Sequence, residues 1–580
     1  MEMKRNLFAI LLIALVILLT PSYLKLISPD AENYQPQEIV QQEEQINEEA
    51  PTTVNPPRNQ VQVEEKQEDT PLDSSADELV IDIETDLFVA KLSNRAGGTL
   101  KDFKLKNYSG GYDDFGSFNG DSLVSLILPG SDQCTPCLAL FDRDEQEYEY
   151  FNHNFDILDS PSSQINLSGS DFMTFKFYLS LPDGRNITKA ITISGNSYSI
   201  DQSYSLDGFD QSYRKNLELV WRNGIRPTES REKEENQYSG AVIYQAGETD
   251  DIKLKDETPI VRKVYDGNTN WVVIKNKYFL VGITSDFPGK YGTLSATNLI
   301  FGDRLITPVY SASIGFDINT SILNSSLYIG PQDYRILKAE GHSLDDAMNW
   351  GFAFIRPISK YVILGLLTFL HNPFGNIFIN YGLVLILFAF LIRLITGPLT
   401  KKSAESAQKM QQLQPRMKLV QEKYKNDPQR KNQEMMKLTK EHGVNPLGGC
   451  LPMLIQMPLL FALFVVFRNT IEFRGAEFIF WIKDLSQPDV IFNLPFSVPI
   501  YGDGVAILPL VMGLTMFLQQ KQSMATMDKS QRPMMYIMSG FFLLLFNTFP
   551  SGLNLYYAVY NFLSFLQQKK IRAAAIKKAS

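Results

Sequence analysis

The sequence predicts a polytopic α-helical membrane protein that carries a large all-β domain outside the membrane. Long apolar runs fill residues 350–568, residues 30–80 are poor in large apolar side chains, and short alternating runs lie between them. The chain has 580 residues, of which 44% are hydrophobic and 21% charged. This composition excludes a fully disordered chain, a collagen and a disulfide-dense secreted scaffold.

Few residues could support catalysis or metal binding. The chain has only four histidines, with no HExxH pattern, and three cysteines, of which Cys134 and Cys137 form one CxxC pair. One such pair cannot make a four-ligand zinc site by itself. No GxxxxGK[ST] motif is present, so no P-loop NTPase is encoded. We therefore expect no catalytic residue, no metal and no cofactor.

Residues 1–28 are predicted to be an N-terminal transmembrane anchor. Lys4 and Arg5 precede an apolar run from Leu7 to Leu19, and a basic flank stays in the cytoplasm. A cleaved signal peptide is the alternative, because the apolar core is short. No small-x-small cleavage site follows the run, which favours an uncleaved anchor. In both cases the following residues are exported.

Residues 29–78 are predicted to be a disordered acidic and Gln-rich linker, because such a composition cannot bury enough apolar surface to offset its conformational entropy. Residues 79–343 are predicted to form a β-sandwich. Alternating runs such as Phe175–Leu179 recur there, with turn signals at Pro182–Gly184 and Asp266-Gly267.

The cysteine pair lies inside this exported region. In an oxidising compartment Cys134 and Cys137 could form a disulfide, and two unpaired thiols in a loop are the equal alternative.

The last third of the chain is predicted to cross the membrane repeatedly. Residues 344–372 suit an amphipathic helix in the membrane interface, interrupted by Pro357. Five apolar spans follow, which with the anchor make six transmembrane helices. They are expected at about residues 377–397, 451–469, 505–520, 534–550 and 552–568.

Charge placement predicts the orientation of these spans. Residues 400–450 contain eleven Lys and Arg against five acids, and the tail 569–580 is also basic. Both segments should therefore be cytoplasmic. Six spans then put both termini in the cytoplasm and the β-domain outside, so the charge pattern and the span count agree.

The loop 400–445 is predicted to be a basic helical hairpin. Pro415 should kink its first helix, Asp427 and Pro428 suit the start of the second, and Gly443 suits its end. The hairpin is either a solvated loop that sets topology or a docking surface for RNA, lipid headgroups or protein. The docking candidates are Lys401, Lys402, Lys409, Arg416, Lys418, Arg430 and Lys431.

Arg393 is a cation inside a predicted span. A charge at the bilayer centre costs at least about 2.5–3.5 kcal/mol on insertion scales, although Arg393 could snorkel to the cytoplasmic headgroups. Polar residues in later spans either line a hydrated cavity with it or bond neighbouring helices. They are Gln456, Asn547, Asn554, Tyr556 and Tyr557. The apolar cores of the spans contain no carboxylate, which favours a mobile, negatively charged substrate over a proton relay.

Five short motifs follow one another within residues 345–570. They are Arg393 with Gly397-Pro398-Leu399-Thr400, Asn445-Pro446-Leu447-Gly448-Gly449-Cys450, Leu454-Ile455-Gln456-Met457-Pro458, Trp481-Ile482-Lys483-Asp484-Leu485-Ser486, and Phe549-Pro550-Ser551-Gly552-Leu553 with Tyr556-Tyr557. In this order and spacing they resemble the YidC membrane protein insertases. The anchor and the exported β-domain look like the Gram-negative branch of that family, located in the inner membrane.

The resemblance implies a fold and a mechanism. Residues 373–568 would be a five-helix insertase core, and the β-domain a β-supersandwich related to sugar mutarotases, without an evident catalytic site. A hydrated groove, open to cytoplasm and bilayer and closed outside, would hold a polar segment of a nascent membrane protein while its apolar segment slides into lipid. The implied groove residues are Arg393, Gln456, Asn554, Tyr557 and Asn547.

The resemblance also implies partners and leaves two alternatives. The family acts as a folding chaperone and beside the Sec translocon, with the cytoplasmic hairpin and tail near the ribosome. A small-solute transporter would need coordinating residues and internal repeats in the spans, and neither is present. An envelope scaffold or glycan-binding protein would tolerate Arg393→Ala. One departure from the family is that the region Asn493–Gly504 looks longer than usual.

Overall fold

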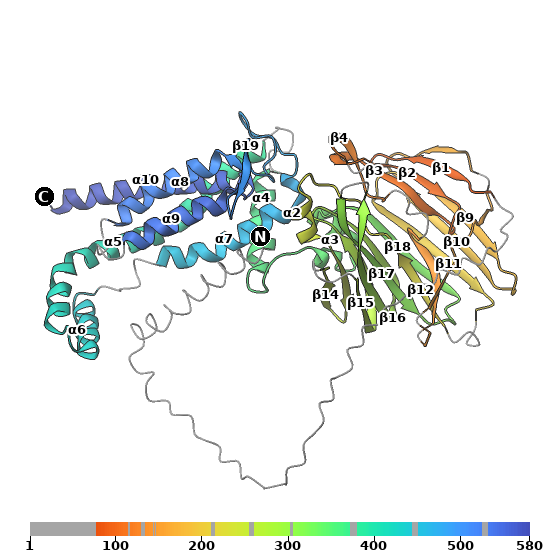
Figure 1. Cartoon of the computed structure of the whole chain (residues 1–580), viewed down its shortest axis with the longest axis horizontal. Helices are drawn as coiled ribbons and strands as arrows, with labels where there is room; N and C mark the ends of the chain where they lie inside the picture. The colour runs from red at the N-terminus through yellow and green to blue at the C-terminus, as the bar shows by residue number, and fades with distance from the viewer. Residues whose placement is uncertain are drawn as a thin grey trace, which may run out of the picture. The chain divides into compact units, whose positions relative to one another are not determined.

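The computed structural model describes residues 77–579 apart from 114–116, 129–133, 143, 146, 160, 210–214, 255–259, 302–304, 372–379, 444–450 and 525–531. The predicted anchor 1–28, nearly all of the linker 29–78 and the motif Asn445–Cys450 lie outside the described residues. The chain divides into two compact units. One is built mainly of strands and contains residues 61–349 together with 469–472, and the other is mainly helical (Figure 1).

The β-unit contains two sheets. The smaller has the order β4-β3-β2-β1-β8, and the larger runs β6-β5-β12-β17-β16-β18-β11-β10-β9-β7, with β13, β14 and β15 branching from β16. The strands of the smaller sheet are β1 (Val80–Glu84), β2 (Phe88–Ser93), β3 (Thr99–Tyr112), β4 (Phe118–Ser125) and β8 (Gln164–Asn166). Those of the larger sheet are β5 (Cys137–Asp142), β6 (Glu147–Tyr150), β7 (Asp156–Ile157), β9 (Phe172–Ser180), β10 (Asn186–Ser194), β11 (Ser199–Asp207), β12 (Asn216–Trp221), β13 (Gly240–Gln245), β14 (Glu248–Ile252), β15 (Ile260–Lys275), β16 (Phe279–Phe301), β17 (Leu305–Phe316) and β18 (Ile322–Pro331). Its helical turns are α2 (Glu232–Tyr238), α3 (Tyr334–Glu340) and η3 (Leu344–Ala347).

Alternation along the strands builds the core of this unit. In β10 every second residue from Ile187 to Ile193 is buried, because successive side chains of a strand point to opposite faces of the sheet. β10 pairs antiparallel with β9, and Ile187 lies opposite Leu179. The predominantly β character predicted from alternation is therefore confirmed for the described residues.

The two turn signals have different outcomes. Pro182–Gly184 forms the turn between β9 and β10, as predicted. The prediction of a turn at Asp266-Gly267 is wrong, because both residues lie within β15 at an irregularity in its pairing with β16. Gly267 has a φ of +128°, so it supplies a bulge. The strand continues because aromatic and β-branched residues pair with β16 on both sides of it.

Cys134 and Cys137 are joined by a disulfide. Both cysteines are fully buried, and Cys137 is the first residue of β5. Of the two alternatives that the spacing leaves open, the structure therefore has the bonded pair.

The helical unit consists of helices of different lengths and one small hairpin. They are η4 (Ile358–Leu364), α4 (Gly365–His371), α5 (Tyr381–Lys423), α6 (Pro428–Glu441), α7 (Leu451–Asn469), β19 (Val490–Val498), β20 (Gly502–Ala506), α8 (Leu508–Met524), α9 (Arg532–Phe546) and α10 (Ser551–Ala579), with a 3-10 turn η7 (Ile471–Phe473) after α7. Among the described residues one stretch, Tyr381–Ser403 of α5, is long and apolar enough to cross a membrane. Shorter apolar stretches lie at Ile358–His371, Gln456–Asn469 and Tyr536–Phe546, and the count of six spans stays a prediction.

The core of the helical unit is apolar and joins α5, α7 and α10. Its fully buried residues include Val384, Leu385, Phe388, Ala389, Ala462, Leu463, Val466, Phe467, Leu553 and Tyr556. α10 contacts both α5 and α8, so it holds the bundle together.

α5 differs from the prediction, which separated a span ending at Gly397-Pro398 from a later hairpin helix. One helix passes through Pro398 and Pro415. Proline removes a backbone donor from a helix, and nearby threonine hydroxyls donate hydrogen bonds to carbonyls in the same turns. Thr396 Oγ1 donates to the carbonyl of Ile392 (2.8 Å) and Thr400 Oγ1 to that of Thr396 (3.0 Å).

Two further helix ends can be compared with the sequence. The start of α6 is as predicted, because Pro428 is its first residue and the Asp427 side chain accepts a hydrogen bond from the backbone N–H of Arg430 (3.0 Å). Gly443, with φ +60°, follows its C-terminus.

In the predicted interfacial segment, Pro357 does not interrupt a helix. It stands in the first turn of the helix, where a missing N–H costs nothing.

Candidate functional site

Arg393 lies inside the helical unit on α5. Its side chain is 7% exposed. Nη1 donates to Thr400 Oγ1 (3.4 Å), and the guanidinium carbon lies 5.5 Å from the centre of the Tyr560 ring. Nε and Nη2 are buried and have no hydrogen-bond partner among the described residues. Two buried donors of a cation without acceptors are costly, so this guanidinium can take a further acceptor.

Tyrosines of α10 form the wall opposite Arg393. The rings of Tyr556 and Tyr560 stack with centres 5.8 Å apart, as expected for residues four apart on one helix. Tyr556 also contacts Phe388 of α5, with ring centres 5.6 Å apart, and the Tyr560 hydroxyl lies 3.4 Å from Thr396 Oγ1. These contacts fix α10 against the part of α5 that carries Arg393.

Gln456 of α7 faces the same tyrosines. Its amide lies near the hydroxyls of Tyr556 and Tyr557, and Tyr556 also lies near Arg393. The Gln456 Nε2 and both tyrosine hydroxyls are buried without a hydrogen bond to described residues. The structure thus brings Arg393, Gln456 and Tyr557 together around Tyr556. Buried polar groups are normally satisfied by protein or water, so this interior has capacity for water or for a polar chain.

The two predicted asparagines make hydrogen bonds to other parts of the helical unit. Asn554 is fully buried, and its Nδ2 donates to the carbonyl of Phe546 (3.1 Å), near the end of α9, which leaves only Oδ1 without a partner. Asn547 binds the β19–β20 hairpin. Its Nδ2 donates to the carbonyls of Tyr501 (2.8 Å) and Gly504 (2.6 Å), and its Oδ1 accepts from the backbone N–H of Ala506 (3.2 Å). Its hydrogen-bonding groups are therefore occupied by structure.

Sequence reasoning gave no site role to four polar residues of this interior, namely Thr396, Thr400, Tyr560 and Gln567, of which Thr400 appears only within a motif. Gln567 Nε2 donates to the carbonyl of Gly397 (3.1 Å). Helical spacing could have identified them, because they continue the faces of Arg393 and Tyr556 at intervals of three, four and seven residues.

The end of the bundle near the start of α10 is tied together by two of the sequence motifs. The Ser551 hydroxyl donates to the carbonyl of Asp484 (2.9 Å), and the backbone N–H of Gly552 donates to that of Leu485 (2.9 Å). A Cβ at Gly552 would lie 2.9 Å from the Phe467 ring, so only glycine fits there. These bonds close this end of the bundle with backbone contacts.

The predicted docking cations lie on α5 and α6, at the other end of the bundle (Figure 1). Lys431 is half-buried and the other six are exposed. Arg416 Nη1 lies 2.9 Å from His442 Nε2, a contact that joins the two helices. The exposed cations are therefore available to a partner.

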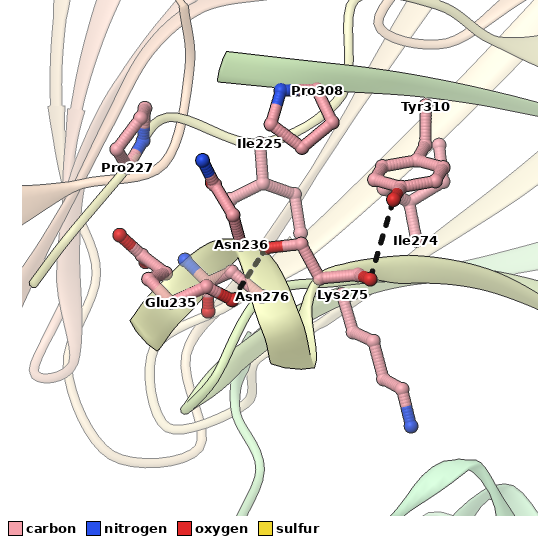
Figure 2. Close-up of a pocket in the computed structure, with 10 residues that line it drawn as sticks. Ile225, Pro227, Glu235, Asn236, Ile274, Lys275, Asn276, Pro308 and Tyr310 are labelled. Carbon is pink, nitrogen blue, oxygen red and sulfur yellow. Dashed lines mark hydrogen bonds between the residues drawn. The ribbon is translucent and has the colours of Figure 1, made fainter. Parts of the chain in front are cut away.

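The β-unit offers no comparable site among its described residues. One cavity in this unit measures ≈ 10 Å³, about the least space that can hold one water, and Figure 2 shows the side chains that line it. Glu235, at its edge, accepts hydrogen bonds from the backbone N–H (2.9 Å) and hydroxyl (2.9 Å) of Thr228, so it holds a loop. The described residues contain no cluster of three metal-ligating side chains.

Comparisons with known proteins agree with this division of the chain. The family model "60Kd inner membrane protein" matches residues 373–578, and "YidC periplasmic domain" matches residues 80–363. The Membrane protein insertase YidC of Chloroherpeton thalassium is 36% identical over 501 residues, which is 85% of this chain and 82% of that protein. The one of Chlorobium limicola is 36% identical over 504 residues, with the same coverage of 85% and 82%.

Solved structures are similar only remotely. An α-galactosidase from Lactobacillus brevis matches 46% of this chain and 41% of its own, with a TM-score of 0.26 and 7% identity, which is too low to carry an argument. The two family models and the curated relatives are decisive. The chain belongs to the YidC family of membrane protein insertases, which insert proteins into membranes.

Proposed function

We propose that the chain inserts nascent inner-membrane proteins through the polar interior around Arg393. One observation carries this proposal, namely a buried guanidinium with two donors that have no partner among the described residues. A guanidinium binds carboxylates and carbonyl oxygens through several directed hydrogen bonds. An acidic or polar segment of a nascent chain supplies such acceptors, and the amide of Gln456 and the hydroxyl of Tyr557 supply neutral partners beside it.

Release follows from the energetics of the apolar segment. Its partition into lipid supplies about 25 cal/mol per Å² of apolar surface removed from water. Arg393 lowers the barrier for the polar segment and does not drive the reaction. Tight binding in the interior would oppose release. The tyrosines of α10 favour release, because their neutral hydroxyls form hydrogen bonds with a passing chain that are weaker than an ion pair.

Location and partners extend the proposal. Family membership implies clients that are nascent membrane proteins, an inner-membrane location and a function that is not enzymatic in the usual sense. We further propose the Gram-negative arrangement with six spans, both termini in the cytoplasm and the β-unit in the periplasm. The basic hairpin then faces the ribosome, and the chain works alone or beside the Sec translocon, also as a folding chaperone. The charge asymmetry of residues 400–450 and 569–580 supports this orientation.

A depletion–rescue assay tests the role of Arg393. Insertion of a small client with an acidic exported segment is followed by protease protection in cells that depend on the wild type, Arg393→Ala or Arg393→Lys. Loss of a charge-assisted hydrogen bond of about 1.5 kcal/mol predicts insertion about tenfold slower for Arg393→Ala. Arg393→Lys should retain part of the rate, because lysine keeps the positive charge but lacks the planar set of donors of the guanidinium.

Arg356→Ala is the matched control, because it removes an exposed arginine of the same unit. It should insert the client at the wild-type rate. If Arg393→Ala, present at normal levels in the membrane, also inserts the client at that rate, Arg393 serves as a snorkelling residue and the proposed route is wrong.

A further inference from the structure

The β19–β20 hairpin between α7 and α8 has no part in the proposed route. Asp503 is the only charged residue between Val490 and Ala506. The hairpin exposes three large apolar side chains, namely Ile491 (49% exposed), Phe492 (53%) and Phe496 (62%). Two-stranded hairpins in water normally protect their strands with charged side chains. A nearly uncharged hairpin with exposed aromatic residues therefore needs an apolar or interfacial partner.

The hairpin is fixed to the membrane helices. Asn547, directly after α9, makes its three hydrogen bonds to residues 501, 504 and 506 of the hairpin. Asp489, directly before β19, accepts from the backbone N–H of Leu508 (2.8 Å), the first residue of α8. The exposed side chains are thus held at a set height relative to α8 and α9. Figure 1 shows β19 at the end of these helices that is remote from the C-terminus.

A second apolar loop is tied to the same place. Ile479 (54% exposed), Phe480 (85%) and Trp481 (40%) are exposed, and the last two rings stack with centres 5.9 Å apart. Trp481 Nε1 donates to Asp489 Oδ2 (2.9 Å), the oxygen that also accepts from Leu508. The loop and the hairpin therefore share one anchor. Grouped exposed apolar side chains mark interaction surfaces, and tryptophan and tyrosine gather at membrane–water interfaces.

We propose that the β19–β20 hairpin docks its apolar side chains into the outer leaflet of the inner membrane. The partner follows from continuity, because β20 ends at Ala506 and α8 begins at Leu508, with no charged residue from 508 to 520. The depth follows from the backbone. A two-stranded hairpin leaves peptide groups unpaired at both edges, and these cannot enter hydrocarbon, so the hairpin reaches the headgroup and upper acyl region. The inference rests on the proposed placement of α8 as a span.

Fluorescence quenching in proteoliposomes tests this docking. Full-length Phe496→Cys in a Cys450→Ser background is labelled with a nitrobenzoxadiazole fluorophore, since Cys134 and Cys137 are already joined. The protein is reconstituted at high lipid excess in phosphatidylethanolamine–phosphatidylglycerol vesicles, with or without a lipid that carries a nitroxide high on the acyl chain. The matched control is Phe172→Cys on β9, because Phe172 is 68% exposed and Phe496 is 62% exposed.

The expected result is a blue-shifted emission at position 496 and a loss of fluorescence with the nitroxide lipid, with neither change at position 172. Water-like emission at position 496 would overturn the proposal. A blue shift without nitroxide quenching would also overturn it, because the fluorophore would then be covered by protein such as a second copy or a client. The Arg393→Ala variant should leave the quenching unchanged, so failure of the insertion route and failure of the docking are separate results.

Discussion

Lys189 is a buried amine in the core of the β-unit. Its side chain is fully buried on β10, and its Nζ has no hydrogen-bond partner among the described residues and lies 5.1 Å from the centre of the Tyr204 ring. Burial disfavours the charged form and lowers the pKa of Lys189 from 10.5 to about 7. The residue therefore reduces stability near neutral pH instead of adding to it.

The pH dependence of this effect has a definite sign. In the unfolded chain Lys189 has the pKa of an exposed lysine, about 10.4. In the folded chain its pKa is about 7, so the folded chain loses this proton at lower pH. The unfolded state thus binds more protons in this window, so the free energy of unfolding should rise with pH from about 7 to about 10. Lys189→Met should flatten this rise and stabilise the β-unit at pH 7 by about 1–3 kcal/mol. Hydrogen exchange of the β10 amides at several pH values measures both effects, and an unchanged pH slope would contradict the assignment.

At the level of single residues, the sequence identifies unusual polar residues more readily than it identifies the groups they contact. Arg393 stands out because a charge in an apolar run is costly, and Gln456 stands out because a neutral amide in such a run needs hydrogen-bond partners. Tyr560 does not stand out, because a tyrosine in a span is ordinary and only the structure shows its contacts with Arg393, Thr396 and Tyr556. Asn547 resembles a groove residue in sequence, yet its bonds go to the β19–β20 hairpin. Sequence alone does not tell which backbone groups a polar side chain satisfies.

Elements were predictable where they are periodic and less so where tertiary contacts decide. The alternation of β9 and the cap of α6 follow from local rules. The passage of α5 through Gly397-Pro398 does not, because packing of α10 and the bond from Gln567 to Gly397 support the helix there. The sequence predicts a span from residue 505, because Val505 begins an apolar run, but this prediction is wrong for the first residues of that run. Val505 lies in β20 and pairs with Phe492 of β19.

The turn between α9 and α10 makes a prediction at the scale of elements. Gly552→Ala would place a Cβ 2.9 Å from the Phe467 ring and 3.1 Å from the carbonyl oxygen of Leu485. Overpacking of this kind costs about 1–3 kcal/mol, so the turn should separate from the segment around Leu485. Limited proteolysis of the protein in proteoliposomes should then cleave that segment faster.

Gly540→Ala is the control for this substitution. Gly540 lies within α9, and a Cβ added there meets nothing within 4 Å. Alanine is favoured over glycine in a helix interior by about 1 kcal/mol, so the control should be as resistant as the wild type or more so. Equal resistance of both variants would mean that the contact between Gly552 and Leu485 does not hold the turn.

For the whole molecule, the distribution of charge is more informative than its sum. The net charge of −9 alone argues against a nucleic-acid partner, yet residues 400–450 hold eleven basic side chains against five acidic ones. Division of a chain between compartments makes the local charge the relevant quantity. The sequence predicts this division from hydropathy and charge, because both act over tens of residues. It could not predict the sheet order of the β-unit, which depends on pairings between strands far apart in the chain.

The proposed ribosome contact is a prediction about this local charge. Exchanging Lys409, Arg416 and Lys418 for glutamine removes three exposed cations from α5. Co-sedimentation of detergent-solubilised full-length protein with ribosomes should fall for this variant. Wild-type binding should itself weaken with added salt, because the Debye length drops from about 10 Å at 0.1 M to about 3 Å at 1 M. Glu422→Gln, an exposed neutralisation of the opposite sign on the same helix, should bind as well as the wild type or better. Wild-type binding by the triple variant at every salt concentration would show that the hairpin sets topology only, and docking would then have to lie in the basic tail.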